Sequence, residues 1–306
     1  MAVDPWQWVA MTLRGPADAI QYACVLEATA PKAGNVHPVA RFDDLCFADF
    51  VTAAELASNE LTRPATGLGD RIYELVLQTR RKTRTNVNLG IALLLGPIVF
   101  VEEKFRQSKE DWTLDRWSDA VRSVLETLPK RQSQRIAEAI ATSMAGGMDG
   151  DYQPSDSSLD VESSAAEEYD IMAGMREAKD RDLIAAEYAG GFRSFFEEVV
   201  PTMQSCVNET GDLLSGIAWT HLRLLASRGD TLIARKNGAQ AEQIIREQAR
   251  QCCIDFEKDR NVLHIAKFDR MLREEGHRRN PGTTADFVAA ALYVCLRMHE
   301  LPDVTA

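Results

Sequence analysis

Apolar residues recur with the spacing of an α-helix along nearly the whole chain, and this pattern constrains the fold most strongly. Residues 70–82, for example, place Ile72, Leu75 and Val76 on one helical face. Residues 88–105 are apolar on nearly all sides, which is typical of a helix in the centre of a bundle. No segment shows the sustained polar–apolar alternation of a half-buried strand. The sequence therefore predicts an all-α protein, a multi-helix bundle of roughly ten helices.

We expect a single all-helical catalytic domain over residues 1–306, interrupted by one acidic loop. The predicted helices cover residues 16–29, 47–62, 70–82, 88–105, 113–125, 131–144, 165–179, 182–198, 212–227, 238–257, 259–275 and 283–298. Residues 146–168 are rich in Gly, Ser and acids, and they contain too few large apolar side chains to offset the entropy of ordering. A flexible surface loop within one domain is favoured there over a domain linker.

Composition excludes several classes of function. The 35 Lys and Arg are outnumbered by 46 Asp and Glu, and the net charge of -11 argues against broad nucleic-acid binding. The longest apolar stretch, residues 91–101, is too short to span a bilayer. The first residues lack the basic and apolar regions of a signal peptide, and the six cysteines form no CxxC pair. We therefore expect a cytoplasmic protein with reduced thiols, with no membrane and no nucleic-acid partner.

Five segments at expected helix ends concentrate small, polar and charged residues. They are residues 26–37, 85–90, 180–192, 227–238 and 278–287. Glu27 lies in the last turn of a helix, where the helix dipole disfavours a carboxylate, and Lys32 follows in the turn. Taken alone, a surface Glu and a turn Lys would explain these two residues. Asn86 and Asn88 open an apolar helix after a basic run, so they form either a helix cap or an anion site.

The other three segments also allow two interpretations. Asp182 can cap a helix and Glu187 can lie on its solvated face, but the following Gly pair suggests that something approaches the backbone closely. Residues 227–238 resemble a phosphate-and-metal loop in content, although the chain has no Walker loop. Asp286 falls in the first turn of a helix that Thr283 or Thr284 would cap. A plain helix start explains this last segment, and a metal or general-base role would also suit the carboxylate.

Taken together and in this order, the segments resemble the triphosphoribosyl-dephospho-CoA synthase family. The family motif Glu-Val-x-x-x-Pro-Lys-Pro-Gly is similar to residues 27–34, with Ala33 in place of the second Pro. The closing Pro-Gly-x-Ser/Thr-Ala-Asp motif is similar to residues 281–286, and the preceding Phe-Asp pair to Phe268 and Asp269. The resemblance covers roughly residues 22–296.

Three further points of the resemblance concern the middle of the chain. A Gly-Asp-Thr loop ending in a cation and a Gly is similar to residues 229–238, and a Glu followed by Gly is similar to residues 187–190. Residues 86–90 stand where the family has Asn-Thr-His-Lys/Arg-Gly, with Asn88 and Leu89 replacing the His and the cation. The segments 34–37 and 180–185 look more like a branch of the family found in organisms with methanopterin-type C1 cofactors.

The resemblance implies a transferase that joins the 5-triphosphoribosyl unit of ATP to the 2′-hydroxyl of 3′-dephospho-CoA and releases adenine. It implies Glu27, Asp230 and Asp286 as catalytic carboxylates, and Asp230 and Asp286 as ligands of Mg²⁺. The residues implied in binding ATP and the acceptor are Lys32, Asn86, Asn88, Glu187, Arg235 and Thr284. Among these, Lys32 and Arg235 would contact phosphate, and the two Asn residues would orient the nucleotide.

Two alternatives to this reaction stay open. The branch similarity suggests ribosyl or phosphoribosyl transfer to a pterin-like acceptor in the biosynthesis of a tetrahydromethanopterin-type cofactor. A different class is a catalytically inactive helical protein that only binds nucleotide, although the acidic residues at the motif positions argue against it. The sequence also leaves a homodimer open.

Overall fold

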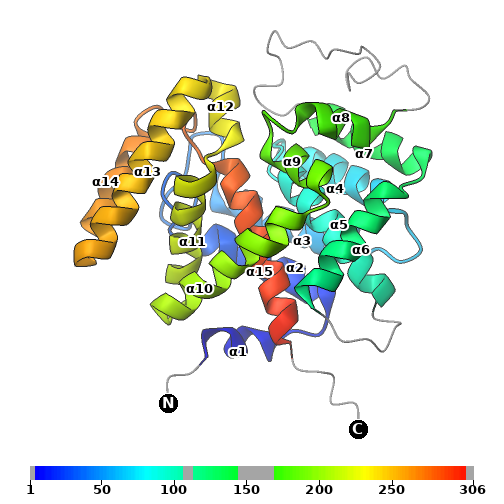
Figure 1. The fold of residues 1–306 in the computed structure, drawn as a ribbon, viewed down its shortest axis with the longest axis horizontal. Helices are drawn as coiled ribbons and strands as arrows, with labels where there is room; N and C mark the ends of the chain where they lie inside the picture. Colours follow the sequence, from blue (N-terminus) through cyan, green and yellow to red (C-terminus); the bar gives the residue numbers. More distant parts are fainter. Residues whose placement is uncertain (1–3, 106–112, 144–168, 301–306) are drawn as a thin grey trace. The chain divides into compact units, whose positions relative to one another are not determined.

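The computed structural model describes residues 4–105, 113–143 and 169–300. Within these ranges it contains fifteen α-helices, one π-helical segment and no β-strand, which confirms the all-α class (Figure 1). The number of helices exceeds the ten or so that the sequence indicated. The predicted acidic loop at residues 146–168 lies outside the described residues. In the described part of the chain, no helix combines the length and the apolar character needed to cross a membrane.

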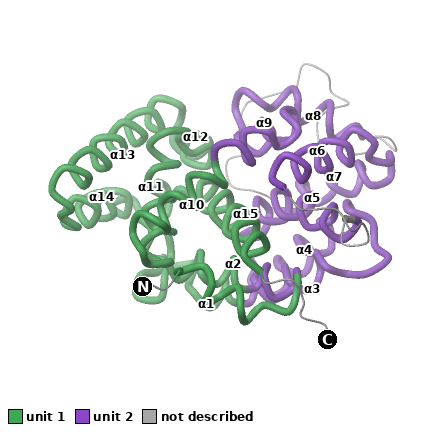
Figure 2. Tube along the Cα trace, turned by 60° about the horizontal axis from the view of Figure 1, so that its bottom comes forward, with its two compact units in different colours: residues 1–15, 22–51, 199–306 green, residues 16–21, 52–198 purple. Residues whose placement is uncertain are grey.

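The chain divides into two compact units, which are coloured separately in Figure 2. Unit 1 comprises residues 1–15, 22–51 and 199–306, and unit 2 comprises residues 16–21 and 52–198. The helices of unit 1 are α1 (Pro5–Ala10), the end of α2 (Pro16–Thr29), α10 (Val200–Thr210), α11 (Leu213–Arg228), α12 (Thr231–Asn237), α13 (Ala239–Asp259), α14 (Leu263–Arg273) and α15 (Gly282–His299).

Helix α15 is the centre of unit 1. Every residue from Phe287 to Leu296 is buried, which accounts for the apolar run that follows Asp286 in the sequence. Helices α1, α10, α11 and α12 pack against α15, while α13 packs against α11, α12 and α14. The N-terminal end of this buried helix therefore lies inside unit 1, and its backbone N–H groups need partners there.

Unit 2 is built around α5, which the sequence correctly indicated as a central helix. Its helices are most of α3 (Phe47–Leu61), α4 (Leu68–Thr83), α5 (Leu89–Phe105), α6 (Leu114–Glu126), α7 (Lys130–Ser143), α8 (Ile171–Ala178), α9 (Leu183–Gly190) and the π-helical segment η2 (Phe195–Val199). Helix α5 packs against α4, α6, α7 and α9, and residues 91–95 are all buried. Pro97 is accommodated inside this helix.

Three helices were absent from the sequence prediction. Helices α1 and α12 have six and seven residues, so few apolar positions mark a stripe in either of them, and α10 directly follows the π-helical segment. The predicted helix over residues 182–198 is also not continuous. Helix α9 ends at Gly190 because Gly191 has a φ of 66° and closes the helix in the left-handed conformation, and a π-helical turn follows.

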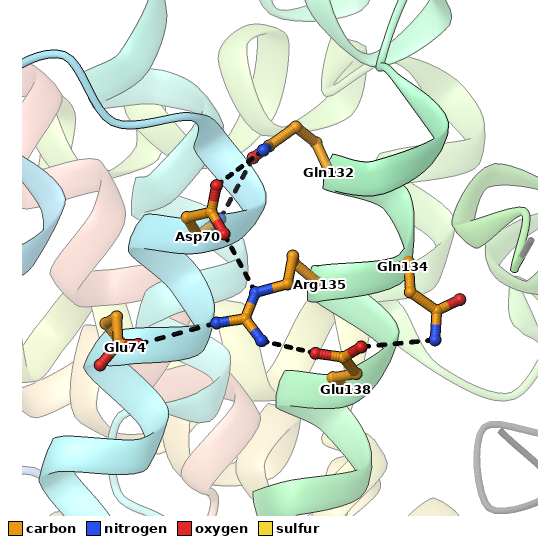
Figure 3. Close-up of polar contacts among 6 residues, drawn as sticks. All are labelled: Asp70, Glu74, Gln132, Gln134, Arg135 and Glu138. Carbon is orange, nitrogen blue, oxygen red and sulfur yellow. Dashed lines mark hydrogen bonds and ion pairs between the residues drawn. The ribbon is translucent and has the colours of Figure 1, made fainter. Parts of the chain in front are cut away.

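A polar network joins α4 to α7 in unit 2 (Figure 3). The Arg135 Nε atom of α7 donates to Asp70 Oδ1 at 3.0 Å, and its Nη2 atom lies 3.6 Å from Glu74 Oε1. The guanidinium also donates to Glu138 Oε2 at 2.6 Å and lies 3.5 Å from the centre of the Tyr73 ring. One guanidinium thus pairs with three carboxylates, two on α4 and one on its own helix, and offsets part of their negative charge.

We expect Arg135→Met to lower the free energy of unfolding by about 1 kcal/mol, because the network is partly exposed and each pair is screened by water. The loss should become smaller as salt is added. The measurement is urea denaturation of both proteins at low and high salt. Arg193→Met is the matched control, since Arg193 is exposed and pairs with Glu197 of the next turn, and it should leave stability unchanged. A loss that is the same at both salt concentrations would contradict the electrostatic explanation.

Candidate active site

Three of the sequence segments meet at the N-terminus of α15, and we call residues 27–35, 229–235 and 281–286 the motif cluster. Asp230 connects two of them. Its Oδ1 atom accepts hydrogen bonds from the backbone N–H groups of Leu232 at 2.9 Å and Ile233 at 3.1 Å, which caps α12. Its Oδ2 atom accepts from the N–H of Thr284 at 2.7 Å and from the Thr284 hydroxyl at 2.8 Å. The single carboxylate therefore caps both α12 and α15.

The sequence predicted that Thr283 or Thr284 caps α15, and this prediction is wrong. The helix begins at Gly282, neither Thr283 nor Thr284 caps it, and Asp286 lies beyond the first turn. The cap comes instead from Asp230, which is 54 positions earlier in the chain. Asp230 is 1% exposed, and burial raises its pKa, while the hydrogen bonds from Thr284 and Ile233 act in the opposite direction.

Glycines of the motif cluster allow its segments to approach closely. Gly34 has a φ of 76°, and a Cβ atom there would come within 2.8 Å of Leu272 and 3.0 Å of Pro281. Gly229 has a φ of 75°, and a Cβ atom there would lie 1.9 Å from a carboxylate oxygen of Glu242. That same oxygen accepts the backbone N–H of Asp230 at 3.2 Å. Both positions therefore require Gly for conformation and for space.

Glu27 and Lys32 form a buried ion pair within the motif cluster. Lys32 Nζ lies 2.9 Å from Glu27 Oε1, and the two side chains are 1% and 5% exposed. The ammonium also donates to the backbone carbonyl of Glu27. Burial raises the pKa of Glu27, and the charge and hydrogen bond of Lys32 lower it again. The pair is internal, so neither residue is the surface group that the simpler sequence interpretation described.

Asp286 is the third carboxylate of the cluster and is partly exposed. Together with Glu27 it raises the pKa of the buried Cys24 thiol, although burial of that thiol contributes most of the shift. Asp286 and Glu27 therefore both lie close enough to Cys24 of α2 to affect its pKa. Among the three predicted catalytic carboxylates, Asp286 is the one that water or a ligand can reach.

His221, which the sequence interpretation did not single out, lies next to this cluster. Its side chain is fully buried on α11, and burial together with the charge of Lys32 lowers its pKa to about 3, with the Pro281 carbonyl acting in the opposite direction. Over the described residues, neither ring nitrogen makes a hydrogen bond of good geometry, although the Pro281 carbonyl lies close enough to act on the ring. A lone His within an apolar helical stripe gives no signal in a single sequence, so only the tertiary structure reveals it.

The two predicted phosphate contacts occupy different environments. The Lys32 ammonium is committed to Glu27, whereas Arg235 is exposed in the last turn of α12. The neighbouring Lys236 is partly buried, which lowers its pKa, and it donates to the carbonyl of His277 at 3.4 Å. The roles of Lys32 and Arg235 in binding phosphate stay predictions, and the geometry favours Arg235.

Unit 2 contains the remaining predicted residues. Asn86 is exposed just before α5, and Asn88 is buried. The Asn88 side-chain amide donates to the Ala53 carbonyl at 2.9 Å and to the Thr79 hydroxyl at 2.8 Å. Glu187 is also buried and accepts from Ser194 Oγ at 2.6 Å and the backbone N–H of Phe195 at 3.0 Å. Asn88 and Glu187 thus have structural contacts, and their roles in binding nucleotide stay predictions.

A magnesium site made only of protein ligands is not evident. No group of three or more His, Cys, Asp and Glu side chains gathers to hold a metal ion within residues 4–105, 113–143 and 169–300. Both oxygens of Asp230 already accept two hydrogen bonds each. These four hydrogen bonds leave Asp230 poorly placed to serve as one of the two predicted metal ligands, and the predicted role of Asp286 in binding metal stays a prediction.

Comparison with known proteins assigns this arrangement to a family. A family model described as ATP:dephospho-CoA triphosphoribosyl transferase matches residues 13–304. The chain belongs to the CitG family. It is accordingly a transferase, and the resemblance seen in the sequence motifs is confirmed.

A solved structure supports the fold of this CitG-family protein. It comes from Archaeoglobus fulgidus and carries the provisional description of a triphosphoribosyl-dephospho-CoA synthase. The two share 22% sequence identity with a TM-score of 0.61, and the match covers 83% of this chain and 98% of the archaeal chain. No curated protein matches the sequence. The CitG motifs at residues 27–34, 229–238 and 281–286 are those that meet in the motif cluster.

Proposed function

We propose that the motif cluster of unit 1 carries out the transfer for which the CitG family is named, with Asp286 as the group that accepts the proton of the attacking hydroxyl. The observation that supports this role is the difference in contacts and exposure among the three carboxylates. Asp230 is committed to capping two helices, and Glu27 is committed to Lys32. Asp286 is partly exposed at the start of the same helix.

The reaction makes one bond and breaks one at the same carbon. The 2′-hydroxyl oxygen of dephospho-CoA bonds to the anomeric carbon of the ATP ribose, and the bond from that carbon to adenine breaks. The hydroxyl proton passes to the Asp286 carboxylate, and the departing adenine takes up a proton at nitrogen. The ribose carries positive charge in the transition state, as in glycoside hydrolysis, so the carboxylates of the cluster also stabilise it electrostatically.

The triphosphate would be held by cations and by N–H groups rather than by a protein-made metal site. Arg235 is the exposed cation of the motif cluster, and it lies on the helix that Asp230 caps. Magnesium bound to the triphosphate would neutralise charge there and would be held by phosphate oxygens and water. Thr284 contributes through its two hydrogen bonds to Asp230, which fix the start of α15.

Asn86 and the basic run before it are the part of unit 2 that could bind an anion. Arg81, Lys82 and Arg84 are exposed, and the first turn of α5 follows them. A helix N-terminus with adjacent cations is suited to phosphate. We therefore keep Asn86 as a nucleotide-binding residue, while the buried amide of Asn88 would act by fixing the turn.

The direct test is to incubate the protein with ATP and Mg²⁺, with and without dephospho-CoA, and to measure adenine. We expect adenine only when dephospho-CoA is present. Asp286→Asn should lower the rate about 100-fold, the effect of removing a general base. Asp259→Asn, at an exposed position at the end of α13, is the matched control and should leave the rate unchanged. Wild-type adenine release by the Asp286 variant would contradict the proposed role.

The same assay separates the two alternatives. Release of adenine with a pterin-type ribosyl acceptor, and none with dephospho-CoA, would favour the tetrahydromethanopterin-type pathway. Binding of ATP without adenine release for any ribosyl acceptor would favour a catalytically inactive nucleotide-binding protein. No feature of the structure favours either of these over transfer to dephospho-CoA.

A further inference from the structure

Two buried polar atoms at the edge of the motif cluster have unmet hydrogen-bonding capacity. Asn35 is 6% exposed, and its Oδ1 atom has no partner in the part of the chain that the structure describes. The same is true of the Nη1 atom of Arg273 on α14, again counting the described residues alone. One atom is an acceptor and the other is a donor. Leaving such groups unpaired in a protein interior costs free energy, so each calls for an explanation.

The surrounding contacts bring these two residues together. Arg273 Nη2 donates to the backbone carbonyl of Asn35, so the guanidinium lies against this residue. The Asn35 side-chain nitrogen donates to Asn280 Oδ1 at 2.6 Å, directly before Pro281. The backbone N–H of Gly34 donates to Asp269 Oδ1 at 2.7 Å. The loop, α14 and the segment directly before α15 are thereby held together.

The local charge is balanced, which favours an uncharged group over a phosphate as the natural occupant. Arg273 Nε donates to both carboxylate oxygens of Asp269, at 2.8 Å and 3.0 Å, and this pairing neutralises the guanidinium. Burial lowers the pKa of the adjacent His37, as does the charge of Arg273, which favours the neutral ring. Lys32 is neutralised by Glu27. A group bound here gains hydrogen bonds but little net electrostatic attraction.

A hydroxyl group suits both kinds of atom. It can donate a hydrogen bond to an acceptor such as Asn35 Oδ1, and it can accept one from a donor such as Arg273 Nη1. If the amides of Asn35 and Asn280 were both reversed, Asn35 would present an unmet donor instead, and a hydroxyl could accept from it too. The edge of a planar base would need both the oxygen and the nitrogen of the Asn35 side-chain amide, but the nitrogen already donates to Asn280.

We propose that Asn35 and Arg273 form a subsite for a ribose hydroxyl of the substrate, at the edge of the motif cluster that also contains Asp286. This inference rests on the proposed function, which brings two riboses to the cluster, one from ATP and one from dephospho-CoA. The subsite would fix the orientation of one ribose relative to Asp286. The residues are ligand-binding groups for an uncharged hydroxyl and take no part in proton transfer.

The test compares binding of hydroxyl-bearing and deoxy ligands by calorimetry on the full chain. One arm uses ATP, 2′-deoxy-ATP and 3′-deoxy-ATP, and the other uses dephospho-CoA and its 2′-deoxy and 3′-deoxy forms. Arg273→Lys keeps the charge beside Asp269 and loses the Nη1 donor. In one of the two ligand series, this variant should bind the hydroxyl-bearing ligand about tenfold more weakly than the wild type does. Binding of the form that lacks the recognised hydroxyl should be the same in the variant and the wild type.

Two further proteins make the result decisive. Asn35→Ser should give the same pattern, and Arg270→Lys, at an exposed position on the same helix, should match the wild type. Equal weakening of the hydroxyl-bearing and deoxy ligands in the folded Arg273 and Asn35 variants, or no weakening, would overturn the subsite even if adenine release proceeds normally. Absence of nucleotide binding to the wild-type protein would overturn the proposed function, and the subsite with it.

Discussion

Lys32→Met is expected to lower the free energy of unfolding by roughly 3–5 kcal/mol near pH 8, the usual cost of breaking a buried ion pair from one side. The substitution leaves the Glu27 carboxylate buried without its cation, since Lys32 supplies both the charge and the nearest hydrogen bond. Methionine fills a similar volume, so the loss measures mainly the charge. Urea denaturation at pH 8 is the measurement.

The same variant should show a characteristic dependence on pH. Burial already raises the pKa of Glu27 above its ordinary value of 4.5, and removing Lys32 raises it further. The folded variant therefore binds a proton more tightly than the unfolded chain does, so its stability falls as pH rises through the raised pKa. Conversely, the deficit relative to wild type should shrink as the pH is lowered from 8 towards 5.

The double variant Glu27→Gln with Lys32→Met provides the control. It removes both charges, so it should recover much of the lost stability and should lack the extra dependence on pH. If Lys32→Met alone were as stable as the wild type at pH 8, or if its deficit did not change with pH, Glu27 would not be an unpaired buried charge in that variant.

Asp230→Ala is the second large effect, and we expect it to destabilise the protein by about 3 kcal/mol. Loss of a helix cap costs about 1 kcal/mol, and here one carboxylate caps two helices and leaves further buried donors unpaired. Asp212→Ala is the matched control. Asp212 is exposed and caps α11 alone, through one hydrogen bond of 2.7 Å from Ser215, and should cost about 1 kcal/mol.

The comparison of these two variants by urea denaturation tests the double cap itself. Asp230→Ala should also abolish adenine release, because the start of α15 carries Asp286. Equal stability losses in the two variants would show that the contact between Asp230 and Thr284 contributes nothing. In that case Asp230 would be free to act as the metal ligand that the family resemblance implies.

Much of the helical fold could be predicted because its signals are local. Asp182 caps its helix as expected, and the apolar run after Asp286 is the buried centre of unit 1. Helix α12 was missed because it has seven residues and a single buried one, Ile233. Its start is defined by a cap that also serves α15, and no local pattern records that connection.

For the candidate site, the sequence indicated which residues belong together better than it indicated what each of them does. The order of the motifs indicated that Glu27, Asp230 and Asp286 belong together, and the structure places all three in unit 1. Which carboxylate is buried, paired or accessible depends on packing between segments far apart in the chain. For the same reason the unmet hydrogen bonds of Asn35, Arg273 and His221 could not be foreseen.

The separation of these segments has a consequence for how the protein is made. The hydrogen bond between Asn35 and Asn280 spans 245 positions, and unit 2 is encoded between the two parts of unit 1 that it connects. During synthesis, all of unit 2 leaves the ribosome before the second half of the motif cluster exists. For most of translation, residues 22–51 therefore lack the later segments that they contact in the folded protein. We expect the protein to become active late, after the last helix has left the ribosome. Contacts between segments far apart in the chain form slowly, so activity should follow their formation.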